Sequence, residues 1–187
     1  MIGSMMDDNS VIDRILNGES ESFRILVERH RKVLLNYIWR MIRQSDDVEE
    51  IGQEVFLQAY RNLGGFDPTR GVPFSAWLIR IARNHWLNHL KKQQRASDYR
   101  ASVDAEAATG PNEPADALQR KQLADSMQTA LATLSPEFRE AFVLVAINGI
   151  PVTTAATVQG VAVGTIKSRL ARARQALNKA LEAHHAA

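Results

Sequence analysis

The sequence contains no cysteine. This absence excludes disulfide-stapled scaffolds, thiolate zinc sites and enzymes that use a cysteine nucleophile. No apolar run approaches the roughly 20 residues needed to cross a bilayer, and residues 1–6 carry neither the basic nor the apolar segment of a signal peptide. We therefore expect a cytoplasmic protein without membrane insertion.

Catalytic motifs are also missing, since the sequence has no phosphate-binding glycine loop, dinucleotide fingerprint or nucleophile elbow. One pattern resembles part of a zinc-protease helix, because His85 and His89 have the spacing of two metal ligands. Trp86 stands where the general-base glutamate belongs, however, and no third ligand is evident nearby. Surface or DNA-facing histidines are the simpler interpretation. The sequence predicts a protein that is not an enzyme, with no catalytic residue, metal or cofactor.

The small net charge of +2 is a sum over segments of opposite sign. Residues 1–69 hold 8 basic and 12 acidic side chains, a net charge of −4, whereas residues 70–100 hold 7 basic and 1 acidic, a net charge of +6. Residues 164–187 hold 5 basic and 1 acidic, a net charge of +4. A polyanion would therefore meet two separate basic surfaces, although such blocks are also typical of ordinary solvated faces.

Apolar residues recur at intervals of three and four through most of the chain, and no alternating strand pattern of useful length occurs. This periodicity predicts an all-α fold, with helices over residues 20–43, 46–63, 74–92, 118–134 and 136–149, followed by two more near the C-terminus. The helix predicted over residues 46–63 contains Gly52, which costs about 1 kcal/mol of helix stability relative to alanine.

The periodicity is lost in residues 93–116, which are polar, rich in alanine and interrupted by proline and glycine. Such a composition predicts an exposed, flexible linker. We therefore expect two small helical domains, over residues 1–92 and 117–187, on either side of this linker.

The C-terminal domain contains the pattern of a helix-turn-helix. A short helix over residues 152–159, a turn that begins at Gly160 and a basic helix over residues 165–181 have the required order. The basic helix has one stripe that faces the core and an outer face that is predicted to contact DNA. Thr165, at the start of the helix, would contact a phosphate. Lys167, Ser168 and Arg172 would lie near base edges, and Arg169 and Arg174 would lie beside phosphates. The alternative is an amphipathic helix whose cations only aid solubility.

Several motifs resemble bacterial sigma factors. Residues 20–95 are similar to region 2 of these proteins, and the similarity lies in FRILVERH at 23–30, DDVEEIGQEVFL at 46–57 and FSAWLIRIARN at 74–84. Residues 118–182 are similar to region 4, mainly through VGTIKSRLARAR at 163–174. A chain with these two domains alone resembles the extracytoplasmic-function (ECF) subgroup of the primary-type sigma factors. The resemblance implies a subunit that binds core RNA polymerase, directs recognition of the −35 and −10 promoter elements and helps to open the DNA.

The resemblance also assigns sites. Docking on the β′ clamp of the polymerase would involve an acidic helix face formed by Asp46, Glu49, Glu50, Gln53 and Glu54. The β flap of the polymerase is a second implied partner. An acidic face speeds encounter with a basic partner and fixes register, although carboxylates in the first turns of a helix also suit its dipole. Asp46, with Glu49 three residues later, is further predicted to cap this helix. The family also implies an anti-sigma factor as a partner.

Contacts with the −10 element would come from the basic segment: Arg80 and Asn84 on one helical face, and Lys91, Lys92 and Arg95 on phosphates. The Gly64–Phe74 loop would receive a base drawn from the stack. Trp77 and Trp86 could stack on bases, but their place on the apolar stripe favours core packing. The −35 duplex would be read by Lys167, Ser168 and Arg172 in the major groove.

Two departures from the family pattern fall in the first helix of the helix-turn-helix. Pro151-Val152-Thr153-Thr154 replaces an opening Ser or Thr followed by acids, and Gln159 occupies a position where Leu or Ile is preferred. A buried Gln159 destabilises this domain unless its amide finds partners. The alternative function is a two-domain helix-turn-helix regulator that does not bind core polymerase, with residues 20–95 as a sensor or dimerisation domain.

Overall fold

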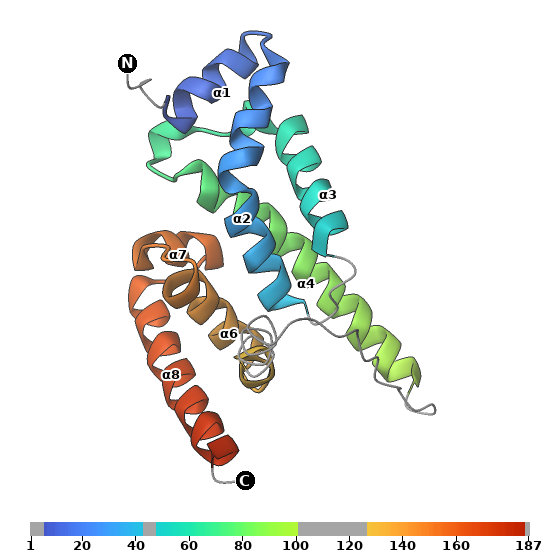
Figure 1. The fold of residues 1–187 in the computed structure, drawn as a ribbon, viewed down its shortest axis with the longest axis vertical. Coiled ribbons are helices and arrows are strands. Elements are labelled where there is room, and N and C mark those ends of the chain that lie inside the picture. The colour runs from blue at the N-terminus through green and yellow to red at the C-terminus, as the bar shows by residue number, and fades with distance from the viewer. Residues whose placement is uncertain (1–5, 43–47, 101–126, 186–187) are drawn as a thin grey trace, which may run out of the picture.

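The computed structural model describes residues 6–42, 48–100 and 127–185, and for residues 89–100 and 181–185 it describes the backbone alone. Within these ranges every regular element is helical, as the periodicity predicts. None of the described helices is long and apolar enough to cross a membrane. The helices form two bundles, which meet along one side of the molecule (Figure 1).

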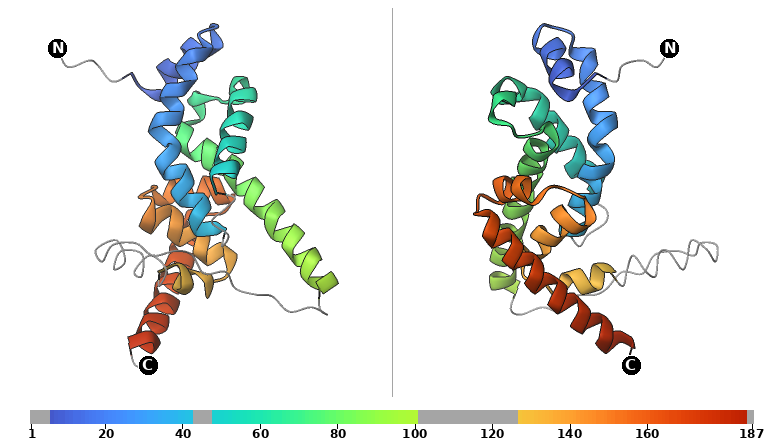
Figure 2. Two further views of the ribbon diagram at one scale, coloured as in Figure 1. Left: turned by 45° about the vertical axis from the view of Figure 1, so that its right-hand side comes forward. Right: turned by 90° about the vertical axis from the view of Figure 1, so that its left-hand side faces the viewer.

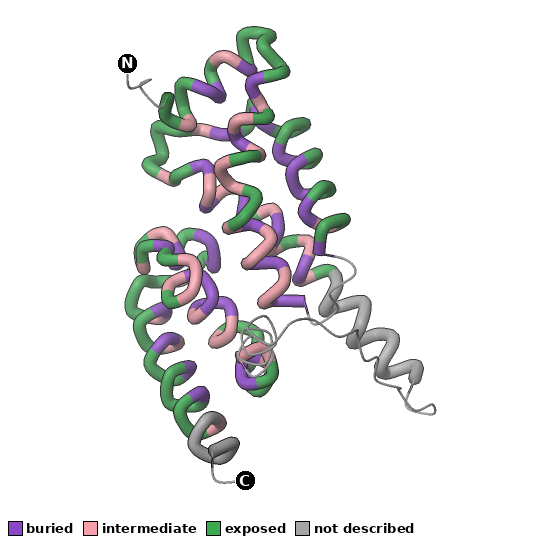
Figure 3. Tube along the Cα trace, viewed as in Figure 1, coloured by how far each residue is buried: buried purple, intermediate pink, exposed green. Residues whose placement is uncertain are grey.

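The N-terminal bundle contains α1 (Asp8–Leu16), α2 (Phe23–Met41), α3 (Val48–Arg61) and α4 (Phe74–Arg100). Helices α2, α3 and α4 pack pairwise against one another, and α1 packs against α2 (Figure 1). Buried residues recur along each of these helices (Figure 3). They belong to the apolar stripes that the sequence predicts and include Leu26, Leu34, Ile38, Val55, Ala59, Phe74, Leu78 and Trp86.

Helix α1 is an element that the sequence analysis did not predict. Asp7 caps it, because its Oδ1 accepts a hydrogen bond from the Ser10 amide at 2.9 Å. Hydrogen bonding by Ser10, first through its side chain and then through this amide, holds the pKa of Asp7 below its usual value. The apolar face of α1, formed by Val11, Ile12 and Ile15, is buried in the bundle. The sequence does contain signals of this helix: an aspartate at the N-cap position, followed by three apolar residues at helical spacing.

Gly52 lies where α3 closely approaches the Leu35 side chain of α2. A Cβ atom at this position would lie 2.5 Å from Cδ2 of Leu35, closer than two such carbon atoms approach. The helix therefore gives up the intrinsic stability of alanine in order to pack tightly. The predicted cap of α3 at Asp46 lies outside the described residues.

Helix α4 is longer than predicted. Its helical backbone continues to Arg100, so residues 93–100, which were assigned to the linker, extend the basic helix instead. Residues 93–100 lack apolar periodicity although they are helical, because a helix that extends beyond its bundle has no partner that requires an apolar stripe. The remaining linker residues, 101–116, lie outside the described ranges.

The C-terminal bundle contains a helical segment over residues 127–132, α6 (Pro136–Phe142), a π-helical turn η4 (Val143–Ile147), α7 (Val152–Gln159) and α8 (Val163–His185). Helix α6 begins at Pro136 as predicted, and the side chain of Ser135, which precedes it, makes no capping hydrogen bond. Helices α6 and α7 both pack on α8 (Figure 2).

The two bundles are in contact in this structure. Helix α7 lies against α4, and η4 lies against α2. Two views related by rotation show the C-terminal bundle beside α4 and the C-terminal half of α2 (Figure 2). These contacts place the helix-turn-helix next to the basic helix of the N-terminal bundle.

Candidate nucleic-acid interface

The outer face of α3 is acidic. Glu49, Glu50, Gln53 and Glu54 are all exposed. Glu49 accepts hydrogen bonds from Arg31 of α2 at 2.9 and 3.0 Å, in a pair that is more than half exposed on both sides and therefore contributes little stability. Glu50 and Gln53 make no hydrogen bond or ion pair with the residues that the structure describes. The fifth predicted docking residue, Asp46, is outside the described ranges.

An apolar groove, which the sequence did not predict, continues this acidic face. Two large apolar side chains of α3 lie on its outer face: Tyr60 is 40% exposed, and Leu57 is 48% exposed. Together with Phe23 and Phe56 they line an open groove of about 520 Å³ between α3 and the start of α2. Gln53, Leu57 and Tyr60 are spaced four and three residues apart, and this spacing was the signal that they share one outer face.

The loop between α3 and α4 has a fixed shape. Asp67 Oδ1 accepts hydrogen bonds from the Thr69 amide at 3.0 Å and from the Thr69 hydroxyl at 2.6 Å, and Asp67 Oδ2 accepts one from Arg70 Nε at 3.2 Å. The bonds from Thr69 lower the pKa of Asp67, so this carboxylate stays charged. Gly71 ends the turn in the left-handed region at φ +66°, which favours glycine.

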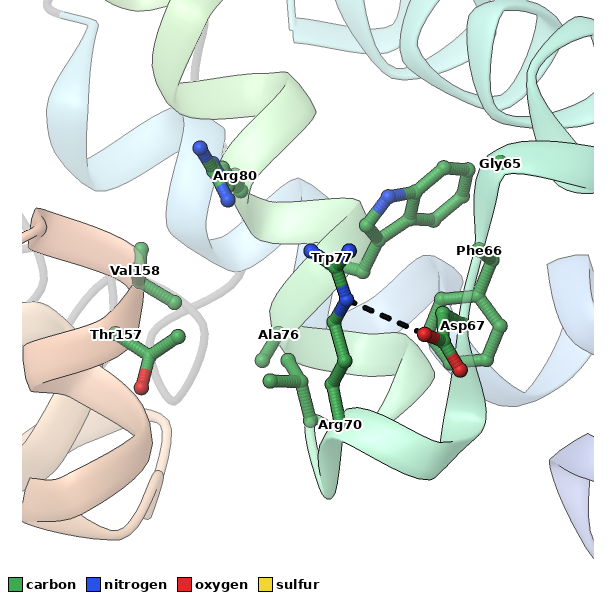
Figure 4. Close-up of a pocket in the computed structure, with 10 residues that line it drawn as sticks. Gly65, Phe66, Asp67, Arg70, Ala76, Trp77, Arg80, Thr157 and Val158 are labelled. Atoms are coloured by element: carbon green, nitrogen blue, oxygen red, sulfur yellow. Dashed lines mark hydrogen bonds and ion pairs between the residues drawn. The ribbon is translucent and has the colours of Figure 1, made fainter.

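Trp77 lies at the wall of a small pocket beside this loop. Phe66 and Phe74 hold its ring, with ring centroids 5.5 and 5.6 Å away. The pocket has a volume of about 190 Å³ and is lined by the loop, by Trp77 and Arg80 of α4, and by Thr157 and Val158 of α7 (Figure 4). The two tryptophans therefore differ. Trp86 is buried and donates a hydrogen bond to the Met41 carbonyl oxygen at 3.1 Å, as expected of a core residue.

Arg80 and Asn84 face a second hollow, which adjoins the first. Both side chains are exposed on α4, and with Trp77 and Asn62 they line a space of about 250 Å³. Because they are four residues apart, they lie on one helical face, as the sequence predicts. Lys91, Lys92 and Arg95 follow on the same helix, where the structure describes the backbone alone.

His85, one of the two histidines considered as metal ligands, contacts α3. Its Nε2 lies 2.7 Å from Gln58 Oε1, and its Nδ1 lies 3.6 Å from a Glu54 carboxylate oxygen. The His89 side chain is outside the description. Among the described side chains, no group of three or more potential ligands could hold a metal ion.

The helix-turn-helix forms from α7, a turn and α8. Gly160 ends α7 in the left-handed region at φ +67°. Helix α8 then begins at Val163, two residues earlier than predicted, and the Thr165 amide already donates to the Ala162 carbonyl at 2.9 Å. The Thr165 hydroxyl, rather than its amide, is therefore the group left for a phosphate. The predicted core-facing stripe is buried, and it consists of Ile166, Leu170, Ala173 and Leu177.

The outer face of α8 carries Lys167, Ser168, Arg172 and Arg174, all exposed. Arg172 makes a cation–π contact with Phe138 of α6, since its guanidinium carbon lies 5.9 Å from the centre of that ring. Arg169 behaves differently: it is half-buried, and it donates a hydrogen bond to Gln159 Oε1. Gln159 thus gains one partner for its buried amide, while its Nε2 has none among the described residues.

Comparison with known proteins gives matches over both bundles. Residues 26–96 match the family model for sigma-70 region 2, and residues 124–177 match the model for sigma-70, region 4. The RNA polymerase sigma-H factor of Pseudomonas aeruginosa is 33% identical over 185 residues, which cover 94% of each chain. The ECF RNA polymerase sigma factor SigW of Bacillus subtilis is 28% identical over 180 residues, which cover 91% of this chain and 94% of that one.

A solved structure shows the same fold. The sigma factor RpoE in complex with the anti-sigma factor NepR, from Bartonella quintana, superposes with a TM-score of 0.72 at 27% sequence identity. The match covers 87% of this chain and 98% of that one.

Proposed function

We propose that this chain, which belongs to the ECF-type sigma factors of the sigma-70 family, binds core RNA polymerase and directs it to promoters, where it recognises the −35 and −10 elements and helps to open the DNA. The observation that carries this proposal is the arrangement of Trp77, Arg80 and Asn84 on one face of α4, beside a loop of fixed shape. Such a face for unpaired DNA is not expected in an ordinary helix-turn-helix regulator, which binds duplex DNA.

The face of α4 suits an unpaired DNA strand. Trp77 offers a ring for base stacking, which is worth about 1–3 kcal/mol per base. Arg80 and Asn84 offer hydrogen-bond donors and, in Asn84, an acceptor for base edges. The pocket at the loop can receive a base, and the few kcal/mol needed to extrude that base are offset by stacking and pairing. Lys91, Lys92 and Arg95 would hold phosphates farther along the helix.

Helix α8 suits duplex DNA. Its buried stripe fixes the helix on the bundle, so that Lys167, Ser168 and Arg172 project together from the outer face. We assign these three to base edges of the −35 element in the major groove. We assign Thr165 and Arg174 to phosphates. Arg169 would join them only after releasing Gln159, to which it is bonded here.

The acidic face of α3 is proposed to dock on the β′ clamp of the polymerase. Glu50 and Gln53 are exposed and have no partner among the described residues, so they can meet a basic surface without breaking an existing bond. The apolar groove at Leu57 and Tyr60 would add buried area next to these charges. The C-terminal bundle would contact the β flap.

The remaining assignments follow from this role. The chain acts as an initiation factor in the cytoplasm and not as an enzyme, and no cofactor is needed. An anti-sigma factor is a further proposed partner, because the solved relative is itself bound to one.

A binding experiment with core polymerase separates this function from the alternative regulator. The full-length chain, immobilised through a terminal tag, is expected to capture core enzyme and to bind promoter duplex tightly only as part of that complex. A chain that leaves core enzyme in solution, yet binds a duplex tightly by itself, would be a helix-turn-helix regulator instead.

A further inference from the structure

Asp8, the first residue of α1, binds two consecutive residues of α2. Its Oδ1 accepts a hydrogen bond from Arg29 Nη1 at 3.0 Å, and its Oδ2 lies 2.8 Å from His30 Nε2. A carboxylate can only accept hydrogen bonds, so His30 donates this one through Nε2. The side chains of Asp8 and His30 are only 26% and 14% exposed, so water competes less for this bond than on an open surface.

The bond to Asp8 orients the imidazole of His30 against the first residue of α4. The centre of the imidazole lies 5.3 Å from the centre of the Phe74 ring, with the two planes at 55°. Phe74 is 1% exposed, so this contact lies inside the bundle. Because the imidazole is held at Nε2, it cannot rotate away, and it forms one fixed wall behind Phe74.

Phe74 belongs to a group of three rings, Phe66, Phe74 and Trp77, which we call the Phe74 cluster. The ring centres of Phe66 and Phe74 lie 5.8 Å apart, and Trp77 lies 5.5 and 5.6 Å from the two phenylalanines. Phe66 and Trp77 line the pocket beside the loop, whereas Phe74 lies behind them (Figure 4). His30 therefore contacts the ring that supports two walls of the pocket.

Helix α1 reaches the same pocket by a second contact. It packs against the short helical turn η2 (Leu63–Gly65), which leads from α3 into the loop (Figure 1). Leu63 of this turn is buried, and Gly65 lines the pocket. Helix α1 thus supports both the loop and the aromatic ring behind it.

We propose that Asp8 and His30 are positioning residues for the base that is drawn from the −10 strand. By fixing Phe74, they hold Phe66 and Trp77 in the arrangement that receives this base. A ring that is already held in place loses little conformational freedom when a base stacks on it, so its support strengthens binding. The identity of the ligand rests on the proposed function. The support of Trp77 does not, so the two parts are tested separately.

Four substitutions distinguish support of the pocket from a simple attachment of α1 to α2. D8A removes both bonds of the carboxylate, and H30Q keeps a donor for Asp8 but removes the ring that contacts Phe74. D8N keeps an oxygen that accepts from His30, and R29A removes only the bond from Arg29. Support of the pocket predicts a loss in D8A and H30Q alone. Simple attachment predicts a loss in D8A and R29A instead.

The first test measures the accessibility of Trp77 in the free, full-length chain. Quenching of fluorescence by acrylamide is recorded for each chain and for the same chain with W77F, and the difference reports Trp77. D8A and H30Q should raise the quenching constant about twofold, because a ring held less firmly is more accessible, and D8N and R29A should match wild type. Equal quenching in all five chains, or equal increases in D8A and R29A, would overturn the proposal.

The second test measures recognition of the base by the complex of the chain with core polymerase. The probes are single strands from the −10 region of a promoter that the chain uses, either intact or with one abasic site. In wild type, one abasic position should weaken binding at least tenfold, since a stacked base is lost. D8A and H30Q should lower this ratio about fivefold, and D8N and R29A should retain it, as base stacking predicts.

The ratio compares two strands on one protein preparation, so a smaller folded fraction does not alter it. A wild-type complex that binds every abasic strand as tightly as the intact strand would contradict the proposed base pocket, and with it the ligand assigned here. A wild type with one sensitive position, together with an unchanged ratio in D8A and H30Q, would overturn the role of Asp8 and His30 and leave the proposed function in place.

Discussion

The carboxylate of Glu140 lies 2.9 Å from Nε of Arg83, although the two residues are 57 positions apart and belong to different bundles. The Arg83 side chain remains 23% exposed, so this ion pair lies at the edge of the interface, while Glu140 is inside it. Burial raises the pKa of Glu140, and the charge of Arg83 offsets part of that increase.

This pKa shift predicts a pH dependence. A carboxyl whose pKa is raised on folding contributes stability that is fully present below its ordinary pKa of 4.5 and is lost as the pH rises through its folded value. We expect urea unfolding of E140Q to lose less stability than wild type as the pH rises through this window. Tyr37, Arg83 and Arg169 face the same group and are unchanged in the variant. Parallel pH profiles for wild type and E140Q would contradict the prediction, and E137Q is the control.

Charge reversal on α3 tests the docking face. E50K with Q53K should weaken binding to core polymerase at least tenfold, equivalent to about 1.4 kcal/mol, because two cations would then face a basic partner. The pair D13K with N17K adds the same charge at exposed positions of α1 and its cap, four residues apart instead of three. Titration of labelled chain with core enzyme measures both. Equal affinities for the two double variants would remove α3 as the docking face.

Asn84 tests the −10 assignment. N84A should lower the rate of promoter opening about tenfold, since one contact to a base edge is worth about 1–3 kcal/mol. Binding to the −35 duplex should be unaffected, because α8 is unchanged. Opening is followed by permanganate reactivity of unpaired thymines. N178A, an exposed asparagine on α8, is the control, and an equal loss of opening and −35 binding in N84A would refute the assignment.

Arg172 and Arg174 are expected to make different kinds of contact with the −35 duplex. R172A should weaken −35 binding and relax the preference for one base pair, because a base contact is lost. R174A should weaken binding to all sequences alike and reduce the salt dependence by about one counterion. Competition binding over a library of −35 duplexes at several salt concentrations measures both effects. An unaltered sequence preference in R172A would exclude it from base reading.

Gly52 is predicted to be a packing requirement. The added methyl group of G52A would lie 2.5 Å from Leu35 Cδ2 and force that side chain to move. Overpacking of this kind costs about 1–3 kcal/mol, more than the gain of about 1 kcal/mol in helix propensity. G52A should therefore unfold at lower urea concentration, and L35A should destabilise G52A less than it destabilises wild type. Strictly additive effects of the two substitutions would show that they do not clash.

Local patterns predicted much of this structure. The spacing of Ile166, Leu170 and Ala173 predicted the buried face of α8. The four-residue spacing of Arg80 and Asn84 predicted that they share one helical face, and in the structure both line one hollow. Such features depend on neighbours within a turn or two, which a sequence displays directly.

Features that depend on distant residues were not predictable in this way. Nothing near Glu140 indicates that its partners are Tyr37 and Arg83, and nothing near Trp77 indicates that α7 closes its pocket. Tyr60 is an apolar residue of α3 that remains 40% exposed, with only the ring of Phe23 of α2 packed on one side among the aromatic contacts of the described residues. Tertiary packing decided these positions.

The proposed function depends most directly on whether the chain redirects core polymerase. Purified core enzyme, with and without the full-length chain, should be incubated with genomic DNA fragments and nucleotides, and the RNA 5′ ends mapped. We expect a set of 5′ ends that requires the chain and shares two upstream sequence elements, with N84A reducing their yield and N178A leaving it unchanged. The same 5′ ends with and without the chain would contradict the account.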